Sequence, residues 1–300
     1  MSAFITSRRL KEMLPESVRR HLGAVKHRLL TMVKHRLLTM PLRTRWQKAK
    51  LLSVSSLNPA QLALLTKTES RISPKDDMLV EGDGDHYFKA GLSAIGCIEE
   101  ALQQAGSITV NAILDLPSGY GRVQRFLVHR FPKARITACD LMPDAIRFCA
   151  KTFGATPAQS SYNLDELSFA TKFDLIWCGS LITHLDADRT RALLRFFTNH
   201  LTAEGLLVLS THGDFVPAKF DMDKFFGLNP SSIPHLVKAF HEQGHGYVDY
   251  PGQSGYGISL TARTWMIAEA LEVGLREVYF RAHGWDNLQD VFGFMKHSPV

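Results

Sequence analysis

The rhythm of apolar and polar positions along this chain changes near residue 106. From residue 51 to 106, apolar side chains recur at helical spacing, with a polar break over residues 81–85. Beyond residue 106, short apolar runs alternate with longer amphipathic stretches. The predicted strands are residues 112–116, 135–140, 173–178, 206–210 and 290–295, and the predicted helices are residues 122–131, 143–153 and 189–201. This alternation predicts an α/β fold with a doubly wound, mostly parallel sheet behind an N-terminal helical extension.

Composition adds a few constraints. The 300 residues are 45% hydrophobic and 21% charged, which is typical of a globular protein and excludes collagen-like and disordered chains. The irregular spacing of the four cysteines favours reduced thiols over a disulfide framework. The apolar runs fall short of the ~18 residues of a membrane span, and no signal-peptide core follows the N-terminal charges. We therefore expect a cytoplasmic protein.

The charge is unevenly distributed along the chain. Residues 1–50 hold 13 Lys and Arg against two Glu, so they carry +11 and the other 250 residues carry −5 of the total of +6. This basic arm contains a tandem octad, residues 25–32 and 33–40, whose apolar positions would form a stripe on a helix. The arm could contact an anionic membrane surface, peripheral to the inner face of the membrane, or be a solvated helix left by a duplication. Nucleic acid is disfavoured as a partner, because only Phe4 and Trp46 could stack on bases.

The first predicted strand runs into a glycine turn, Asp115-Leu-Pro-Ser-Gly-Tyr-Gly121. Gly119 and Gly121 permit a tight turn whose backbone N–H groups can approach a ligand. A dinucleotide fingerprint would need a third glycine at position 124, where Gln124 stands. Asp115 instead offers a carboxylate to a cationic, amino-acid-like group.

The second predicted strand ends in another acid, Asp140. A carboxylate at this strand tip can accept hydrogen bonds from both hydroxyls of a ribose, and Leu141 and Met142 follow it, where they could pack on a purine. For Asp140 alone, a helix N-cap or a surface acid is the alternative interpretation. The glycine turn before it favours the ribose role.

These residues resemble the class I, Rossmann-like methyltransferases that use S-adenosylmethionine (SAM). Residues 115–122 resemble the first motif of that family, Asp140 its ribose-binding acid, residues 173–185 its fourth-strand motif and residues 204–211 its fifth strand. More loosely, residues 86–88, 256–259 and 284–291 resemble a bacterial subgroup of poorly defined substrate, from which the chain departs at Ser118 and Tyr120. The resemblance implies SAM as the cofactor. It also implies further cofactor contacts by Pro117, Gly179, Ser180 and, in place of the acid that many relatives carry after the third strand, Ser161.

Methyl transfer from a sulfonium needs alignment, exclusion of water and, for some acceptors, a base. His184, just after the fourth predicted strand, is our candidate catalytic base, and a packed or capping histidine is the alternative. Four residues are expected to contact the substrate or to cap the pocket: Tyr87, Phe88, His212 and Trp285. For the first two, a place in the hydrophobic core is the alternative.

Absent motifs narrow the acceptor. The fourth predicted strand is followed neither by an Asn-Pro-Pro-Tyr/Phe segment nor by a Pro-Cys nucleophile, and the metal-binding acids of catechol-type enzymes are missing. An oxygen or nitrogen of a small molecule or glycan remains. A Phe-rich insertion, residues 214–254, is interpreted as a lid over the substrate, with a helical decoration of the sheet as the alternative. Residues 241–245 fit the H-E-x-x-H zinc pattern, but Gly244 weakens the helix that the pattern needs, so we expect no metal site.

The sequence thus predicts three parts. They are a basic amphipathic arm (1–50), a helical cap segment (51–106) and a SAM-dependent methyltransferase domain (107–300). Two other functions stay open: an NAD(P)-dependent oxidoreductase of the Rossmann kind, and a non-catalytic, membrane-associated binding module.

Overall fold

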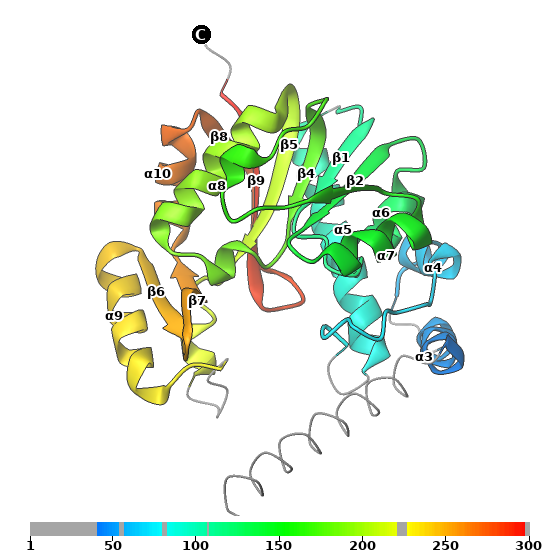
Figure 1. The fold of residues 1–300 in the computed structure, drawn as a ribbon, viewed down its shortest axis with the longest axis horizontal. Helices are drawn as coiled ribbons and strands as arrows, with labels where there is room; N and C mark the ends of the chain where they lie inside the picture. Colours follow the sequence, from blue (N-terminus) through cyan, green and yellow to red (C-terminus); the bar gives the residue numbers. More distant parts are fainter. Residues whose placement is uncertain (1–40, 54–56, 80–82, 107, 221–226, 298–300) are drawn as a thin grey trace, which may run out of the picture.

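Seven strands form one sheet at the centre of the molecule (Figure 1). The structure is a computed structural model that describes residues 41–53, 57–79, 83–106, 108–220 and 227–297. In spatial order the strands are β3 (Thr156–Gln159), β2 (Arg135–Asp140), β1 (Ala112–Asp115), β4 (Phe173–Cys178), β5 (Leu201–Thr211), β9 (Gln289–Lys296) and β8 (Leu275–Trp285). Strands β1 to β5 are parallel, and β9 is antiparallel to both of its neighbours. The predicted Rossmann-like α/β fold is confirmed.

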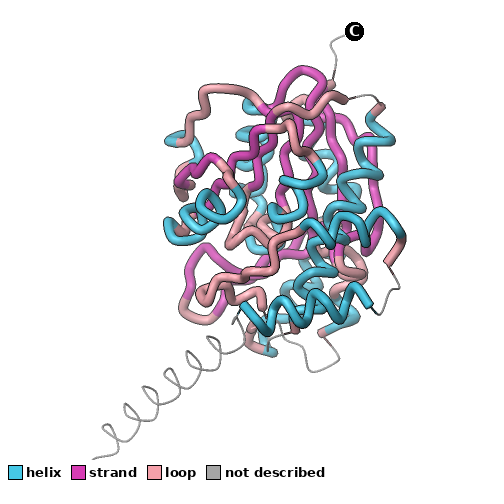
Figure 2. The backbone as a smooth tube through the Cα atoms, turned by 90° about the vertical axis from the view of Figure 1, so that its right-hand side faces the viewer, coloured by secondary structure: helices cyan, strands magenta, loops and turns pink. Residues whose placement is uncertain are grey.

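Helices cover both faces of this sheet (Figure 2). On one face α5 (Gly84–Ala105) and α6 (Gln124–Arg130) pack on Ile113 and Leu175, and α7 (Pro143–Phe153) packs on the same side of β2. On the other face α8 (Ala187–His200) and α10 (Arg263–Glu272) pack on Leu114 and Ile176. Because successive strand residues face opposite sides, strands that are buried on both sides are apolar at every position, which explains the uninterrupted apolar runs.

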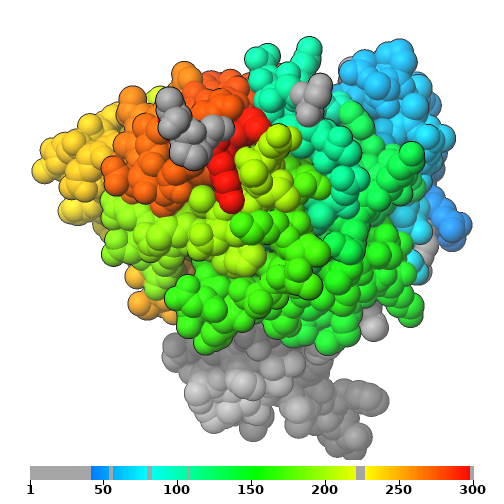
Figure 3. Space-filling model, turned by 90° about the horizontal axis from the view of Figure 1, so that it is seen from above, coloured from blue at the N-terminus to red at the C-terminus, as the bar shows by residue number. Residues whose placement is uncertain are grey.

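The sequence pattern did not predict strand β8, which forms one edge of the sheet. Its charged residues Arg276, Glu277 and Arg281 interrupt the apolar positions, as is common for an edge strand with a solvent-facing side. Seen from above, the end of β9 (red) emerges between the segments that hold β8 (orange) and β5 (yellow-green) (Figure 3). The C-terminal strand β9 thus lies between β5 and β8 and runs antiparallel to both.

Between β5 and α10 the chain forms the predicted insertion, at the lower left of Figure 1. It contains α9 (Ile233–Gln243) and a hairpin of β6 (His245–Tyr250) and β7 (Gln253–Thr261), closed over a small core of its own. The hairpin continues past residue 254, where the sequence analysis ended the insertion, because β7 pairs with β6 and not with the main sheet. Two of the insertion's phenylalanines, Phe225 and Phe226, lie outside the described residues.

The N-terminal helices α3 (Pro41–Ser53) and α4 (Pro59–Lys67) pack beside α5. Helix α3 buries Thr44, Gln47 and Leu51, so it crosses the boundary predicted between residues 50 and 51. The tandem octad of residues 25–40 lies outside the described residues, and the membrane hypothesis for the arm stays a prediction. In the part of the chain that the structure describes, no helix combines the length and apolar character needed for a bilayer crossing.

Candidate active site

The carboxyl ends of the parallel strands meet at one edge of the sheet, the lower edge in Figure 1. The strand order reverses between β1 and β4, and such a reversal is where doubly wound sheets bind their ligands. Because β9 is antiparallel, the turn between β8 and β9 lies at the same edge. The insertion lies to one side of this edge and the N-terminal helices to the other (Figure 1).

Asp115 ends β1 at this edge and is almost fully buried, with 1% of its surface exposed. Its Oδ2 atom has no hydrogen-bond partner in the described part of the chain. Burial, and secondly the charge of Asp140, raises the pKa of Asp115 well above its usual range. A buried carboxylate without a donor is unfavourable, so this site would be stabilised by a cationic ligand group.

The glycine turn and Asp140 form one hydrogen-bonded unit. The Gly119 N–H donates to Asp140 Oδ2 over 2.8 Å, and the Met142 N–H donates to Oδ1 over 2.9 Å. Gly119 and Gly121 have positive φ angles of 50° and 79°, and a Cβ on Gly121 would lie 2.4 Å from the Phe153 ring. Only glycine therefore fits position 121 without a shift of its neighbours.

The structure brings seven of the predicted cofactor residues to this turn and the adjoining strand tip: Asp115, Pro117, Gly119, Gly121, Asp140, Leu141 and Met142. The last two are 42% and 44% exposed, so they offer an open apolar surface beside the acid. The arrangement suits a ligand that has a cationic group, vicinal hydroxyls and a flat apolar ring.

Beneath the turn lies Arg125, a residue that the sequence analysis missed. Its side chain is fully buried, and its Nε donates to Gly121 O over 3.1 Å. Nη1 donates to backbone carbonyls in residues 69–71, and Nη2 donates to the Tyr87 hydroxyl over 3.1 Å. That hydroxyl donates in turn to Asp76 Oδ2 over 2.6 Å, while burial raises the pKa of Asp76. Arg125 thus links the N-terminal cap segment to the glycine turn. The sequence pattern did not indicate this role, because an arginine on a helix is usually exposed to solvent.

The four residues predicted to cap the pocket are all buried. Tyr87 and Phe88 belong to the core of α5, and the Arg125 guanidinium lies over both rings. Trp285 donates from Nε1 to Ala90 O over 2.8 Å. Burial, followed by the charge of His184, lowers the pKa of His212 to about 3, so this imidazole is neutral at physiological pH. Their direct contact with a substrate stays a prediction.

Gly179 and Ser180 follow β4 at the same edge. A Cβ on Gly179 would lie 2.7 Å from the Trp177 ring. The Ser180 N–H donates to Ser210 Oγ over 2.9 Å, and the Ser180 hydroxyl accepts from Gln289 Nε2 over 3.0 Å. The Ser210 hydroxyl donates to Gln289 Oε1, which closes a network across β4, β5 and β9. Ser180 therefore shapes the edge through its contacts with these strands, and Gln289 is a further residue that the sequence analysis did not single out.

His184 lies in the 3-10 turn η3 (Ile182–His184) after β4. Its Nδ1 is 2.8 Å from Gly257 O, so Nδ1 must carry the proton that this carbonyl accepts, and in the neutral ring Nε2 keeps its lone pair. Burial lowers the pKa of His184, opposed by this hydrogen bond. A neutral imidazole held in this tautomer can accept a proton from a ligand at pH 7.

The predicted adenine contact after β3 is occupied by protein hydrogen bonds. Ser161 Oγ donates to Glu166 Oε2 over 2.7 Å and accepts from the Asn163 N–H over 3.1 Å. Gln159 Nε2 donates to Leu141 O over 2.8 Å and so orders the backbone beside Asp140. A contact of Ser161 with a ligand stays a prediction.

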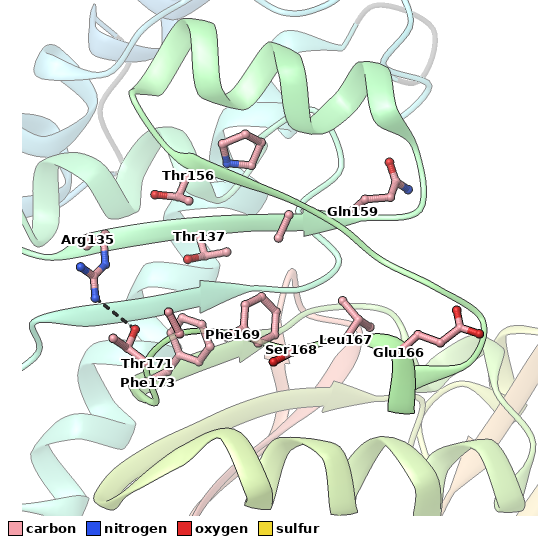
Figure 4. A pocket seen from close by; sticks show the side chains of 13 residues that line it. Arg135, Thr137, Thr156, Gln159, Glu166, Leu167, Ser168, Phe169, Thr171 and Phe173 are labelled. Carbon is pink, nitrogen blue, oxygen red and sulfur yellow. Dashed lines mark hydrogen bonds between the residues drawn. The ribbon is translucent and has the colours of Figure 1, made fainter.

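A separate hollow of about 540 Å³ runs along β2 and β3 (Figure 4). It exists because the β3 to β4 connection contains only the short turn η2 (Leu164–Glu166) where a helix would cover the sheet. At one end Arg135 Nη2 donates to Thr171 Oγ1 over 3.0 Å, the dashed line in Figure 4. Asp115, Asp140 and His184 do not line this hollow, so it is not the site described above.

The two histidines of the zinc-like pattern do not share a helix. Helix α9 ends at Gln243, Gly244 has a φ of 76°, and His245 belongs to β6, where it stacks on Trp265 at 4.4 Å. Across the described ranges there is no group of three side chains suited to hold a metal ion. The H-E-x-x-H spacing thus lacks its structural basis, which is two histidines one helical turn apart.

Comparison with known proteins agrees with this geometry. Residues 114–207 match the family model of a methyltransferase domain. No curated protein gives a match. A SAM-dependent methyltransferase from Clostridium acetobutylicum is similar in structure, with a TM-score of 0.50 and 14% identity over 74% of this chain and 96% of that one. The PH0226 protein from Pyrococcus horikoshii has a TM-score of 0.49 and 16% identity, over 68% and 90% of the two chains. At 14% identity, the similarity to the Clostridium acetobutylicum structure shows the fold alone.

Proposed function

We propose that this protein, which carries a methyltransferase domain on a class I, Rossmann-like sheet, transfers the methyl group of SAM to an oxygen or nitrogen of a small molecule or glycan. One observation carries the proposal. The Oδ2 atom of Asp115 is buried without a hydrogen-bond donor among the described residues, directly beside the glycine turn that Asp140 holds. An ammonium group, such as that of an amino acid, is the ligand group that would stabilise it most.

The residues at the strand tips fit this cofactor. Asp115 would bind its amino group, Asp140 its ribose hydroxyls, and Leu141 and Met142 its purine. Gly119 lets the backbone come close, because no side chain stands there. When bound, the sulfonium supplies the methyl group, which is the reactive part of the chemistry.

His184 would take the acceptor's proton on Nε2, since Gly257 O holds the other ring nitrogen protonated. The insertion that carries Gly257 would orient the acceptor and exclude water from it. His184 can act as the base at pH 7, because burial lowers its pKa and so keeps its imidazole neutral.

An NAD(P)-dependent oxidoreductase fits less well. Gln124, where a dinucleotide site would have its third glycine, is fully buried beneath the turn. In addition, Asp115 places an acid beside the turn, where a pyrophosphate would need a cation or a hydrogen-bond donor. Both features disfavour a dinucleotide ligand.

Calorimetric titration of the full chain tests this assignment. We expect SAM to bind with a dissociation constant on the order of micromolar, since metabolite sites commonly fall in the range of about 1 μM to 1 mM, and we expect NADH and NADPH to give no heat of binding. Labelled SAM, offered with panels of small metabolites and glycans, should then label an acceptor. Binding of NADPH without binding of SAM would reverse the choice between the two functions.

The rate of methyl transfer to an acceptor found in that panel should depend on pH through His184. A base acts in its deprotonated form, and the pKa of His184 is lowered, so the acidic limb should lie below the pH of about 6.5 at which an ordinary histidine titrates, and the rate should be level above about pH 7.5. His184→Asn, which can still donate to Gly257 O, should lower kcat by about 10²-fold to 10⁴-fold and abolish the acidic limb.

A matched control for this variant is His200→Asn. His200 also bonds a backbone carbonyl through Nδ1, Phe196 O at 2.8 Å, but it lies at the end of α8 away from the site. Its variant should keep the wild-type profile. An unchanged rate in His184→Asn would instead assign His184 a packing role.

A further inference from the structure

Three aromatic rings gather where the insertion meets the tip of β4. The rings of His184 and Tyr256 stack with centroids 4.9 Å apart and planes 29° apart. Tyr250 lies 5.9 Å from the His184 ring and 5.5 Å from the Tyr256 ring, and its hydroxyl is 3.3 Å from His184 Nδ1. Both tyrosines come from the β6–β7 hairpin. We call these three residues the aromatic face.

The aromatic face is half-buried and open on one side. Tyr256 is 43% exposed, whereas His184 and Tyr250 are partly covered by the hairpin. An exposed tyrosine ring that stacks on a partly covered histidine presents an apolar surface to solvent without being part of a core. Such a surface suits a ligand better than it suits water.

Tyr256 of the aromatic face is also within electrostatic range of a proposed cofactor residue. Besides burial, the groups that raise the pKa of Tyr256 are Asp77, Asp140 and Tyr162. Asp140 is the acid at the tip of β2, and Asp77 belongs to the N-terminal cap segment that Arg125 ties to the glycine turn. The phenol of Tyr256 therefore lies within electrostatic range of both sides of the site.

Acids lie near the exposed ring of the aromatic face, Tyr256. The groups that act most strongly on Tyr256 are acids, and burial keeps the phenols of Tyr250 and Tyr256 protonated, raising the pKa of Tyr250 to about 12. Arg189 lies at the hairpin turn near Gly255 but is paired with Asp186. Ring faces carry a negative quadrupole and attract cations, so rings and carboxylates favour the same kind of ligand.

We propose that Tyr250, Tyr256 and His184 form the acceptor-binding face of this enzyme, and that it selects an acceptor with a cationic amine on a compact apolar body over an anionic one. The inference rests on the proposed function, which it deepens by naming the charge class of the acceptor. Acidic groups and rings would hold the ammonium, and the ring of Tyr256 would pack on the apolar body.

Three probes of one shape test the proposal: cyclohexylamine, cyclohexanol and cyclohexanecarboxylate, titrated into the full chain at pH 7.5 and followed by ligand-observed NMR. We expect the ammonium probe to bind about tenfold more tightly than the carboxylate, with cyclohexanol between them. Tyr256→Leu should weaken binding of the ammonium probe about tenfold and of cyclohexanol much less. Tyr256→Phe, which keeps the ring, should bind the ammonium probe as the wild type does.

Tyr247→Leu is the matched control. Tyr247 lies on the same hairpin strand, but its ring does not join the core cluster of the insertion on which Tyr250 packs, and its hydroxyl donates to Asp249. Its variant should bind all three probes as the wild type does. Wild-type binding of the ammonium probe by Tyr256→Leu, equal binding of the carboxylate probe, or no ammonium binding up to about 10 mM would each overturn the proposal.

Titration of the same proteins with SAM separates the two levels of inference. If the wild type binds SAM but the probes do not follow the expected order, only the acceptor assignment fails. If the wild type does not bind SAM, the proposed function fails, whatever the probes do.

Discussion

Asp140→Ala is expected to weaken SAM binding about a hundredfold or more. Hydrogen bonds to a charged group contribute roughly 1.5–3 kcal/mol each, and the variant would lose two of them to the ribose. The variant would also lose the hydrogen bond from the Gly119 N–H to Asp140 Oδ2, which loosens the glycine turn. Calorimetry of the purified variant measures the change directly.

Two further variants make this result specific. Asp140→Asn keeps the volume and one acceptor oxygen, so it should lose only about tenfold. Asp188→Ala removes an acid on α8 that is paired with Arg191 on the surface, and it should leave SAM affinity unaltered. If Asp140→Ala binds SAM with an affinity within about threefold of the wild type, the assignment of Asp140 to the cofactor site is wrong.

Arg125→Met should have the largest effect on stability. The guanidinium is fully buried and donates to three backbone carbonyls and the Tyr87 hydroxyl, and Asp76 beyond Tyr87 would lose its only buried cationic neighbour among the described residues. Removing one partner of such a network lowers the free energy of unfolding by roughly 3–5 kcal/mol. Denaturant unfolding followed by circular dichroism measures this loss.

The loss should depend on pH. Burial raises the pKa of Asp76, and a group whose pKa is higher in the folded state stabilises the fold as the pH falls. Without the Arg125 charge this shift grows, so the difference between variant and wild type should be larger at pH 7 than at pH 5. Because Nε holds Gly121 O, the folded fraction of the variant should also bind SAM more weakly.

Arg130→Met controls for the loss of an arginine from the same helix. Arg130 is exposed and paired with Glu99, so its replacement should change the free energy of unfolding by no more than about 0.5–1 kcal/mol. A comparable loss in both variants would indicate that charge on α6, and not the buried network, stabilises the cap.

Local sequence pattern was sufficient for much of the sheet. The predicted strands at residues 135–140 and 173–178 have the bounds of β2 and β4, and the helix at residues 143–153 has those of α7. Each of these elements buries an apolar face of its own, and that face is formed by residues that are close together in the sequence. The glycine turn and its two acids were predictable for the same reason, since a tight turn between a strand and a helix has local chemical requirements.

The elements that the pattern missed depend on partners far along the chain. Strand β8 is an edge strand that is ordered by pairing with β9, and β7 pairs with β6 in a separate hairpin. Arg125 and Asp76 are 49 positions apart and meet only because α5 brings Tyr87 between them. Spacing along one helix carries no information about such contacts.

Local sequence specifies the kind of site: a glycine turn with Asp115 and Asp140 on an α/β sheet. Which residues surround this site depends on the fold, because burial and pairing are set by contacts between segments that are remote in the chain. Tyr87 and Phe88 lie in the core beneath the Arg125 guanidinium, and Tyr250 and Tyr256 contact His184 because of a hairpin that begins more than 60 residues after it. A carboxylate at a strand tip is a local feature, whereas the aromatic face opposite it exists only in the folded chain.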